Sequence, residues 1–452
     1  GKGQEFAIAK LAGLATRNFS QEAGFIQPSF AMTVRNVELR DEEESPPINP
    51  PPTSDPPDGG VQAWTQVAMG WIVMVISWGW VNSFGGFQAY YISELPESPS
   101  TISWIGSVQA WLTFSTGAFS GRLLDAGFFT PALLVGAVLQ LVGIFLTSIA
   151  TKYWQLLLTQ GILTGFGGGI LFTPSVGLVL TYFSSRRAIA LGIITTGNSI
   201  GGLAYPILVR GLLPRLGFAW TMRLIGFVHM VGFGLVACLM RSRLPPRKAG
   251  PIIDWVAFKE SVFLSYNAGL FFFNWAMYYT FYHIGAFGIQ VLGMPYSEAA
   301  YLVTIVNGVG VPARLVIPLL AGRYGPLNMM IIMGSCVTVM AFCWLATSDR
   351  IGMYIWAAIY GLFSGGFQSL IPTGLASITK SLDMVGTRLG MFFTVISFAA
   401  LTGPPIGGAI QTAEHGGYRV AEIWAALATL LCTLFVATTR VRKVGWKIGA
   451  PA

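Results

Sequence analysis

Long apolar runs separated by short polar breaks make up most of the chain after about residue 60. Each run has about 20 residues or more, which is the length that an α-helix needs to cross the hydrocarbon core of a bilayer. The pattern therefore predicts an all-α membrane protein with twelve transmembrane helices. The predicted spans lie near residues 64–91, 103–123, 129–150, 153–182, 188–210, 218–240, 262–291, 299–321, 327–347, 352–378, 387–410 and 419–439.

Composition supports the same class, because 53% of the residues are apolar, 10% are charged and the mean hydropathy is +0.62. These values do not suit a soluble domain. The first 60 residues differ, since an acidic run at 41–44 is followed by a proline-rich run at 46–57 that cannot build a core. We expect residues 1–60 to form a disordered cytoplasmic tail, with an interfacial amphipathic helix at 6–14 as an alternative for its start.

Lys and Arg are distributed unevenly between the two sets of predicted loops. Fifteen of them follow even-numbered spans or lie after the last span, whereas only Lys152, Arg210, Arg215, Arg350 and Arg419 lie in the other loops. The positive-inside rule therefore predicts that both termini are cytoplasmic. The net charge of +8 then reflects the topology in the membrane. The sequence contains no basic stripe on a soluble domain, which is the pattern that would indicate a nucleic-acid partner.

The two halves of the chain resemble each other at a fixed offset of 198 residues. The matching positions are Gly167 and Gly365, Gly168 and Gly366, Pro174 and Pro372, Gly192 and Gly390, and Pro206 and Pro404. They fall at equivalent points of spans 4–5 and 10–11, which indicates duplication. The predicted organisation is a six-helix half at 61–240, a cytoplasmic linker at 241–259, a second six-helix half at 260–440 and a cytoplasmic tail at 441–452. Parallel halves with a site between them near the midplane describe the major facilitator architecture.

Two separated motifs stand before predicted helices 1 and 5, Pro57-Asp-Gly-Gly60 shortly before Trp64 and Tyr182-Phe-Ser-Ser-Arg-Arg-Ala-Ile-Ala-Leu-Gly192. They resemble the signatures of the monocarboxylate transporter family of the major facilitator superfamily, especially its fungal branch. The segments 80–85 and 103–107 also fit. The resemblance covers roughly residues 55–440 and implies a secondary-active transporter that works by alternating access.

A third motif, Gly121-Arg-Leu-Leu-Asp125, matches half of the general superfamily loop motif, because Phe128 and Phe129 stand where basic residues are expected. The predicted gating residues at the cytoplasmic end are Asp58, Gly59, Gly60, Arg122, Asp125, Arg186, Arg187 and Arg323. A purely structural interpretation stays open for them: the glycines permit a tight turn, and the arginines anchor the membrane boundary.

Arg314 is the only charged residue in the apolar run from Tyr301 to Ala321. An ionisable group inside a membrane segment normally faces the bundle interior and marks a binding or ion pathway. Snorkelling is the alternative, since Arg314 stands 7 residues from Ala321, about 10 Å along a helix. The resemblance implies that this Arg pairs with a substrate carboxylate, and a guanidinium suits that role because it offers two charge-assisted bonds.

The chain departs from the family pattern at two positions. Proton-coupled lactate carriers of the family have an Asp one turn before this Arg and a Lys in helix 1, where this chain has Gly310 and Asn82. Two members of the Lys, Asp and Arg set are thus missing, which argues against transport of lactate or pyruvate by that set. Aromatic residues in spans 1 and 7 predict a larger pocket instead. The predicted substrate-binding residues are Arg314, Asn82, Trp78, Gln109, Asn274, Tyr278, Tyr279, His283 and Gln368, although the two glutamines fit cross-helix bonding equally well.

Few titratable groups can carry a coupled proton. The candidates are His229, His283 and Glu298, and histidine suits the role because its charge changes near neutral pH. A structural histidine, uniport and exchange stay open. The sequence offers no catalytic or phosphate-binding motif and no metal or cofactor site, so we expect no enzyme and no cofactor. A nontransporting sensor on the same scaffold is a further alternative.

We therefore predict a secondary carrier in the plasma membrane, functional as a monomer, for an organic acid or an acidic, partly aromatic metabolite. Export of a fungal secondary metabolite is the favoured interpretation, with protons as possible coupling ions. Proton-coupled import of small monocarboxylates is the alternative.

Overall fold

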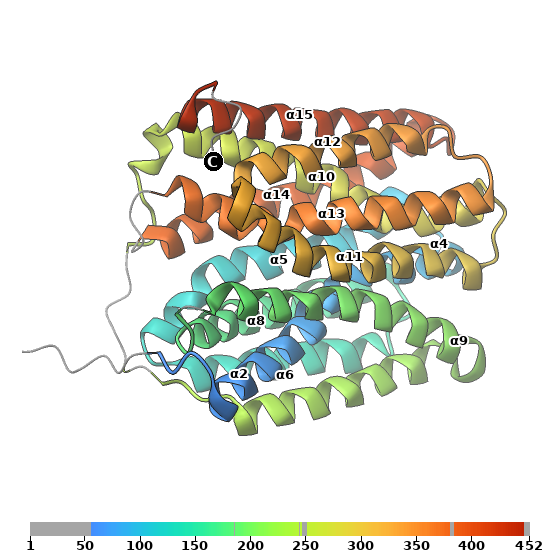
Figure 1. Ribbon diagram of the computed structural model, residues 1–452. Helices are drawn as coiled ribbons and strands as arrows, with labels where there is room; N and C mark the ends of the chain where they lie inside the picture. Colours follow the sequence, from blue (N-terminus) through green and yellow to red (C-terminus); the bar gives the residue numbers. More distant parts are fainter. Residues whose placement is uncertain (1–55, 185, 244, 246–250, 380–383, 447–452) are drawn as a thin grey trace, which may run out of the picture. The chain divides into compact units, whose positions relative to one another are not determined.

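The computed structural model describes residues 56–184, 186–243, 245, 251–379 and 384–446 (Figure 1). The predicted N-terminal tail up to residue 55, with its candidate helix at 6–14, lies outside the described residues. So do residues 246–250 of the predicted linker and residues 447–452 of the predicted C-terminal tail. The described residues form helices, turns and bends and contain no strand.

The helices fall into two groups along the chain, separated by the linker. The N-terminal helices are α2 (Gly60–Met74), the π-helical turn η1 (Val75–Gly79), α3 (Trp80–Asn82), α4 (Phe84–Glu94), α5 (Pro99–Asp125), α6 (Phe129–Thr147), α7 (Tyr153–Leu156), the π-helical turn η2 (Leu157–Leu163), α8 (Thr164–Leu180) and α9 (Arg187–Leu239). After a short 3₁₀ turn, η3 (Ala257–Lys259), the C-terminal helices are α10 (Ser261–Gln290), α11 (Tyr296–Tyr324), α12 (Pro326–Trp344), α13 (Arg350–Ile378), α14 (Val385–Ala413) and α15 (Arg419–Val444). In Figure 1 the first group runs from blue to green and the second from yellow to red.

Eight helical stretches of the described residues are long and apolar enough to cross a membrane. One of them, α9, contains two predicted spans, because Gly217 leaves the helical conformation with φ 72° and ψ 173°. Helices α5, α10 and α13 are not among the eight although they have 27, 30 and 29 residues. Buried polar side chains lower the hydropathy of α5 and α10. The all-α membrane class is confirmed, and twelve crossings stay a prediction.

Helix starts extend beyond the apolar runs because polar caps lie outside them. Ser98 accepts a hydrogen bond from the Thr101 amide at 3.2 Å, so α5 begins at Pro99 rather than near residue 103. Asp349 caps α13 in the same way by accepting from the Gly352 amide at 2.9 Å. Each cap satisfies an amide that the first helical turn leaves without a partner.

The first span changes its helical register near its middle, at η1. A π-helical turn leaves backbone groups without their usual partners and is often found at functional sites. Here the buried side-chain amide of Gln140 on α6 donates a hydrogen bond to the Ile76 carbonyl. The polar group of Gln140 thus supports the irregular turn that carries Trp78.

Glycine allows the closest helix contacts. A Cβ atom built on Gly201 of α9 would lie 2.6 Å from the Cα of Gly79, and one built on Gly197 would lie 2.6 Å from the Trp71 carbonyl oxygen. Small residues let membrane helices approach at backbone distance. Between the two groups of helices, a Cβ on Gly202 would lie 2.7 Å from the Asn307 side chain. Gly197, Gly201 and Gly202 are therefore points of close helix packing.

We expect Gly201→Ala to destabilise the purified protein by about 1–3 kcal/mol, because its methyl group meets backbone that cannot move aside. Gly234, also in α9, is the matched control, since nothing lies within 4 Å of a Cβ built there. Gly234→Ala should be neutral or stabilising by up to about 1 kcal/mol. Thermal unfolding in detergent measures both, and equal melting temperatures for the two variants would contradict the packing role.

Candidate functional site

Arg314 lies in the middle of α11, and its side chain is only 4% exposed. Its Nη2 donates a hydrogen bond to Oε1 of Gln368 on α13 at 3.0 Å, whereas its Nε has no partner. None of the ion pairs between described residues includes Arg314. The guanidinium is therefore buried against α13 and does not reach an interface by snorkelling.

Arg314 and Gln368 together leave two buried donors unsatisfied, the Nε of the guanidinium and the Nε2 of the amide. A buried charge that lacks an opposite charge is costly, and a buried donor without an acceptor adds to that cost. Both donors are satisfied by a group with two acceptor oxygens and negative charge, such as a carboxylate. The pair is thus chemically suited to an organic anion.

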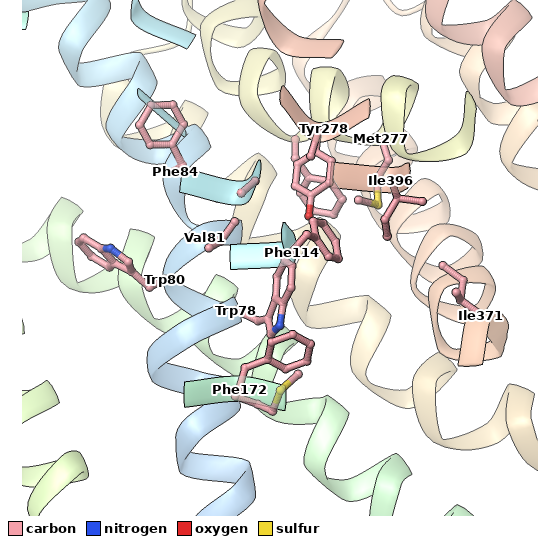
Figure 2. Packing of buried hydrophobic residues seen from close by; sticks show 14 of the residues in the cluster. Trp78, Trp80, Val81, Phe84, Phe114, Phe172, Met277, Tyr278, Ile371 and Ile396 are labelled. Carbon is pink, nitrogen blue, oxygen red and sulfur yellow. The ribbon is translucent and has the colours of Figure 1, made fainter. Parts of the chain in front are cut away.

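Four aromatic side chains form a row where the two groups of helices meet. Trp78 of η1 lies 4.4 Å from Phe114 and 5.3 Å from Phe172, and Phe114 lies 6.3 Å from Tyr278 of α10, measured between ring centroids. Figure 2 shows these four side chains, which we call the aromatic row, one after another between the helices. Tyr278 is also close enough to Arg314 for an electrostatic interaction. Phe114 therefore lies between the predicted residues Trp78 and Tyr278, and of these two it is Tyr278 that lies near the cation.

Asn82 and Gly310 both lie against α9. Asn82 donates through Nδ2 to Oδ1 of Asn198 at 2.5 Å. The neighbouring Ser199 has a buried hydroxyl without a partner, and a Cβ built on Gly310 would lie 3.8 Å from it. Asn82 thus meets a neutral amide, and a hydroxyl without a partner faces Gly310, which stands one helical turn before Arg314.

Gln109 and Asn274 bond within their own group of helices. The Gln109 amide donates to Oγ1 of Thr164 at 3.0 Å, and its Oε1 has no partner. The Asn274 amide donates to the Leu270 carbonyl of its own helix at 2.8 Å. Cross-helix bonding, the alternative raised for Gln109, is what the geometry of that residue shows.

His283 lies between the two groups of helices. Its Nε2 lies 3.2 Å from the Pro404 carbonyl oxygen, and its ring nitrogens lie 3.4 Å from the Gln88 amide nitrogen of α4. Tyr279 stacks on this imidazole with ring centroids 4.9 Å apart, and its hydroxyl accepts from Gln411 at 2.9 Å. A neutral imidazole that donates to the carbonyl and accepts from the amide satisfies these partners.

Hydrogen bonds between the two groups gather at the end where α4 ends and α5 begins, opposite the linker. We call this set of contacts the gate. Its bonds link Gln88 with His283, Ser100 with the Pro405 carbonyl at 2.9 Å, Tyr282 with the Gly106 carbonyl at 3.0 Å and Tyr296 with the Gly86 carbonyl at 3.1 Å. The structure is therefore closed at this end.

At the linker end, the two signature motifs contact each other although they are far apart in the sequence. Asp58 accepts a hydrogen bond from the Ser184 amide at 2.5 Å, and its own amide donates to the Tyr182 carbonyl at 3.1 Å. A Cβ on Gly59 would lie 3.6 Å from a guanidinium nitrogen of Arg186. The start of α2 is thus fastened to the chain just before α9.

The other predicted gating residues lie at the same end. Arg122 and Asp125 occupy the last turn of α5, and Arg323 is exposed in the last turn of α11. Arg187 opens α9 and donates to the Phe183 carbonyl at 2.7 Å. Gly60 has a φ of 83° and opens α2.

The remaining titratable candidates bond neither Arg314 nor His283, although Glu298 stands two residues after Tyr296 of the gate. His229 pairs with the Tyr205 hydroxyl at 2.7 Å and packs edge-on against Trp80, both among the N-terminal helices. Glu298 is exposed and pairs with Arg350 at 3.3 Å. In the part of the chain that the structure describes, no three His, Cys, Asp or Glu side chains are grouped so that they could hold a metal ion.

Sequence reasoning missed several residues of the site. Phe114 and Phe172 complete the aromatic row, Gln88 bonds His283, and Ser199 faces Gly310. Each is an aromatic or polar residue in an apolar run, like many others in this chain, and the local sequence does not say which helix it will meet.

Comparison with known proteins gives relatives that match most of the chain. A protein of Gibberella zeae described as an MFS-type transporter is 42% identical over 393 residues, which cover 86% of this chain and 89% of that protein. An MFS-type transporter of Ophiocordyceps is 36% identical over 89% of this chain and 90% of its own length. An aspyridones efflux protein of Emericella nidulans is 34% identical over 84% of this chain and 78% of its own length. The family model of the Major Facilitator Superfamily matches residues 66–373. The chain therefore belongs to the Major Facilitator Superfamily of membrane transporters.

Proposed function

We propose that this transporter exports an acidic, partly aromatic secondary metabolite by alternating access. The observation that carries the proposal is the buried Arg314, which has one neutral acceptor and a free Nε. A substrate carboxylate or an equally acidic group satisfies that nitrogen and the free amide nitrogen of Gln368. The attraction between the guanidinium and the substrate anion is strongest where water is excluded, so a buried Arg314 favours binding of an anion.

The side chains near Arg314 support a substrate that is larger than a small acid and partly aromatic. The aromatic row offers faces and edges for stacking, which a two- or three-carbon acid cannot use. Asn82 and Ser199 add neutral polar groups from the N-terminal helices, suited to a hydroxyl or carbonyl of the same substrate. A substrate that spans the site touches both groups of helices, as alternating access requires.

We also propose that the direction of transport is export and that the chain is close to the monocarboxylate transporters. A similar protein is named as an efflux protein for a fungal metabolite, which supports export. The motifs around Asp58 and Arg186 support a place near the monocarboxylate transporters. Import of small monocarboxylates is the second candidate, and Gly310 and Asn82 argue against it because they lack the ionic groups implied by the resemblance. We further propose a monomer in the plasma membrane with both termini cytoplasmic, which places the gate on the outer side.

His283 is our proposed proton-coupling residue. Its partners are the Gln88 amide, the Pro404 carbonyl and the ring of Tyr279. The neighbouring gate residue Tyr282 is neutral as well, and no carboxylate among the described residues hydrogen-bonds to His283. A buried imidazolium without an acid nearby is costly, so the closed gate favours the neutral ring. Protons on the outer side then favour the open gate, in which water can solvate a charged imidazole.

Arg314→Gln should lower the flux of an acidic aromatic substrate into proteoliposomes. Losing one charge-assisted hydrogen bond costs about 1.5–3 kcal/mol, which is about ten- to a hundredfold at low substrate concentration. Arg314→Lys should be intermediate, because it keeps the charge but loses the planar fork. Arg215→Gln removes an exposed charge and serves as control. Wild-type flux in folded Arg314→Gln protein would rule out the anion site.

Gly310→Asp should reduce anion transport more than Gly310→Ala does, by about tenfold. The new carboxylate stands four residues before Arg314, where the two side chains can pair, and it competes with the substrate for the guanidinium. The alanine variant measures the steric effect alone, since a Cβ there would lie 3.3 Å from the Gly361 carbonyl oxygen. Equal flux in both variants would show that the substrate charge does not meet Arg314.

His283→Gln should abolish the response of flux to a pH gradient while leaving flux without a gradient within about tenfold of wild type, the effect of one neutral hydrogen bond. His229→Gln is the matched control and should keep the response, because its partner Tyr205 lies among the N-terminal helices. Flux is measured with acid on either side of the proteoliposome membrane. Loss of the response in His229→Gln alone would transfer the role to His229.

A further inference from the structure

The segment 251–259, between the two groups of helices, has its apolar and polar sides reversed relative to a soluble loop. Ile252, Ile253, Trp255, Val256 and Phe258 are exposed by between 39% and 71%, with Trp255 the most exposed. Asp254, in the same segment, is only 7% exposed. A loop in water would turn its acid outward and cover its large apolar side chains.

The segment is held firmly in this orientation by the C-terminal helices. Arg388 of α14 donates from Nε to Asp254 at 2.9 Å and binds both carboxylate oxygens of Glu260 at 2.8 and 3.1 Å. Thr387 donates to the Pro251 carbonyl at 3.0 Å. These contacts connect the segment to the first turn of α14 and to the residue before α10, so its apolar face is fixed outward.

The position of the segment corresponds to the surface of a bilayer. Helix α10 begins two residues after it and has 30 residues, about 45 Å at 1.5 Å per residue. This length matches a bilayer with its headgroup layers, about 40–45 Å. Leu264, one turn into α10, is 45% exposed, so the apolar outer surface continues from the segment onto the helix.

The composition of the segment also matches that place. Tryptophan is enriched at membrane interfaces, where its ring lies among the headgroups. Trp255 and Phe258 form a ring pair with centroids 6.0 Å apart, and the exposed Lys259 follows them. A basic residue beside exposed aromatics complements a leaflet that contains anionic lipids.

We propose that residues 251–259 form an interfacial anchor that inserts its apolar side chains into the lipid leaflet at the linker end. Through Arg388 the anchor holds the starts of α10 and α14 at the membrane surface. Since α14 packs against α5 of the other group, the anchor provides a fixed point for the C-terminal helices. The proposal requires only a membrane protein and is independent of the substrate.

A spin label tests the anchor in the full chain reconstituted into nanodiscs of zwitterionic and anionic lipid. Cys238, Cys336, Cys343 and Cys432 are first replaced by serine or alanine. Trp255→Cys then receives a nitroxide, with Val256→Cys as a second site should the first variant fold poorly. The control is Gly322→Cys, which is exposed at the same end and has nothing within 4 Å of its Cβ.

Accessibility of the label to oxygen and to a water-soluble nickel chelate shows whether the segment faces lipid, water or protein. We expect the ratio of oxygen to nickel accessibility to be at least about fivefold higher at residue 255 than at residue 322, because oxygen partitions into lipid. A ratio equal to that of the control would mean that the segment faces water. Protection from both reagents would mean that protein covers it, either another part of this chain or a second copy. Either result would overturn the proposal.

Discussion

The absence of water from the bilayer core is the constraint on which this structure depends. A backbone polar group that the chain carries into the hydrocarbon region must find a partner within the protein. Gln140 supplies a donor to the Ile76 carbonyl at the irregular turn of the first span, and Gln109 bonds Thr164. These bonds stabilise helices that glycine allows to pack closely, as at the contact between Gly79 and Gly201. Tight packing and internal hydrogen bonding therefore hold the N-terminal helices together as one packed group.

The same constraint makes the boundary between the two groups the place where function can reside. Contacts there use backbone carbonyls as acceptors, as when Tyr282 bonds Gly106 and Tyr296 bonds Gly86. Such neutral bonds contribute about 0.5–1.5 kcal/mol each, so the gate can open without breaking either group of helices. Ser199 instead faces Gly310 with a hydroxyl that has no partner. Weak neutral bonds thus close one end of the structure, whereas this hydroxyl beside Gly310 is left without a partner.

The sequence predicted the class and the main cation for a definite physical reason. Apolar runs and an Arg within one of them are local signals, so the membrane helices and the buried position of Arg314 could be predicted directly. The pairing of Asn82 with Asn198 and the row from Trp78 to Phe172 could not, because periodicity does not tell which neighbour a helix will meet. The break at Gly217 had a local signal in a glycine that follows Pro214 by three residues. The reversed segment around Asp254 depends on a partner more than a hundred residues away.

Two buried arginines of the C-terminal helices, Arg314 and Arg388, differ in whether an acid balances their charge. Arg388 meets two carboxylates, Asp254 and Glu260, and its charge is balanced within the protein. Arg314 is as deeply buried but meets only the neutral amide of Gln368. Burial of an unbalanced charge lowers stability, so it persists where a ligand restores the balance. The contrast between two arginines on one scaffold therefore supports Arg314, rather than Arg388, as the cation that we propose to meet the transported anion.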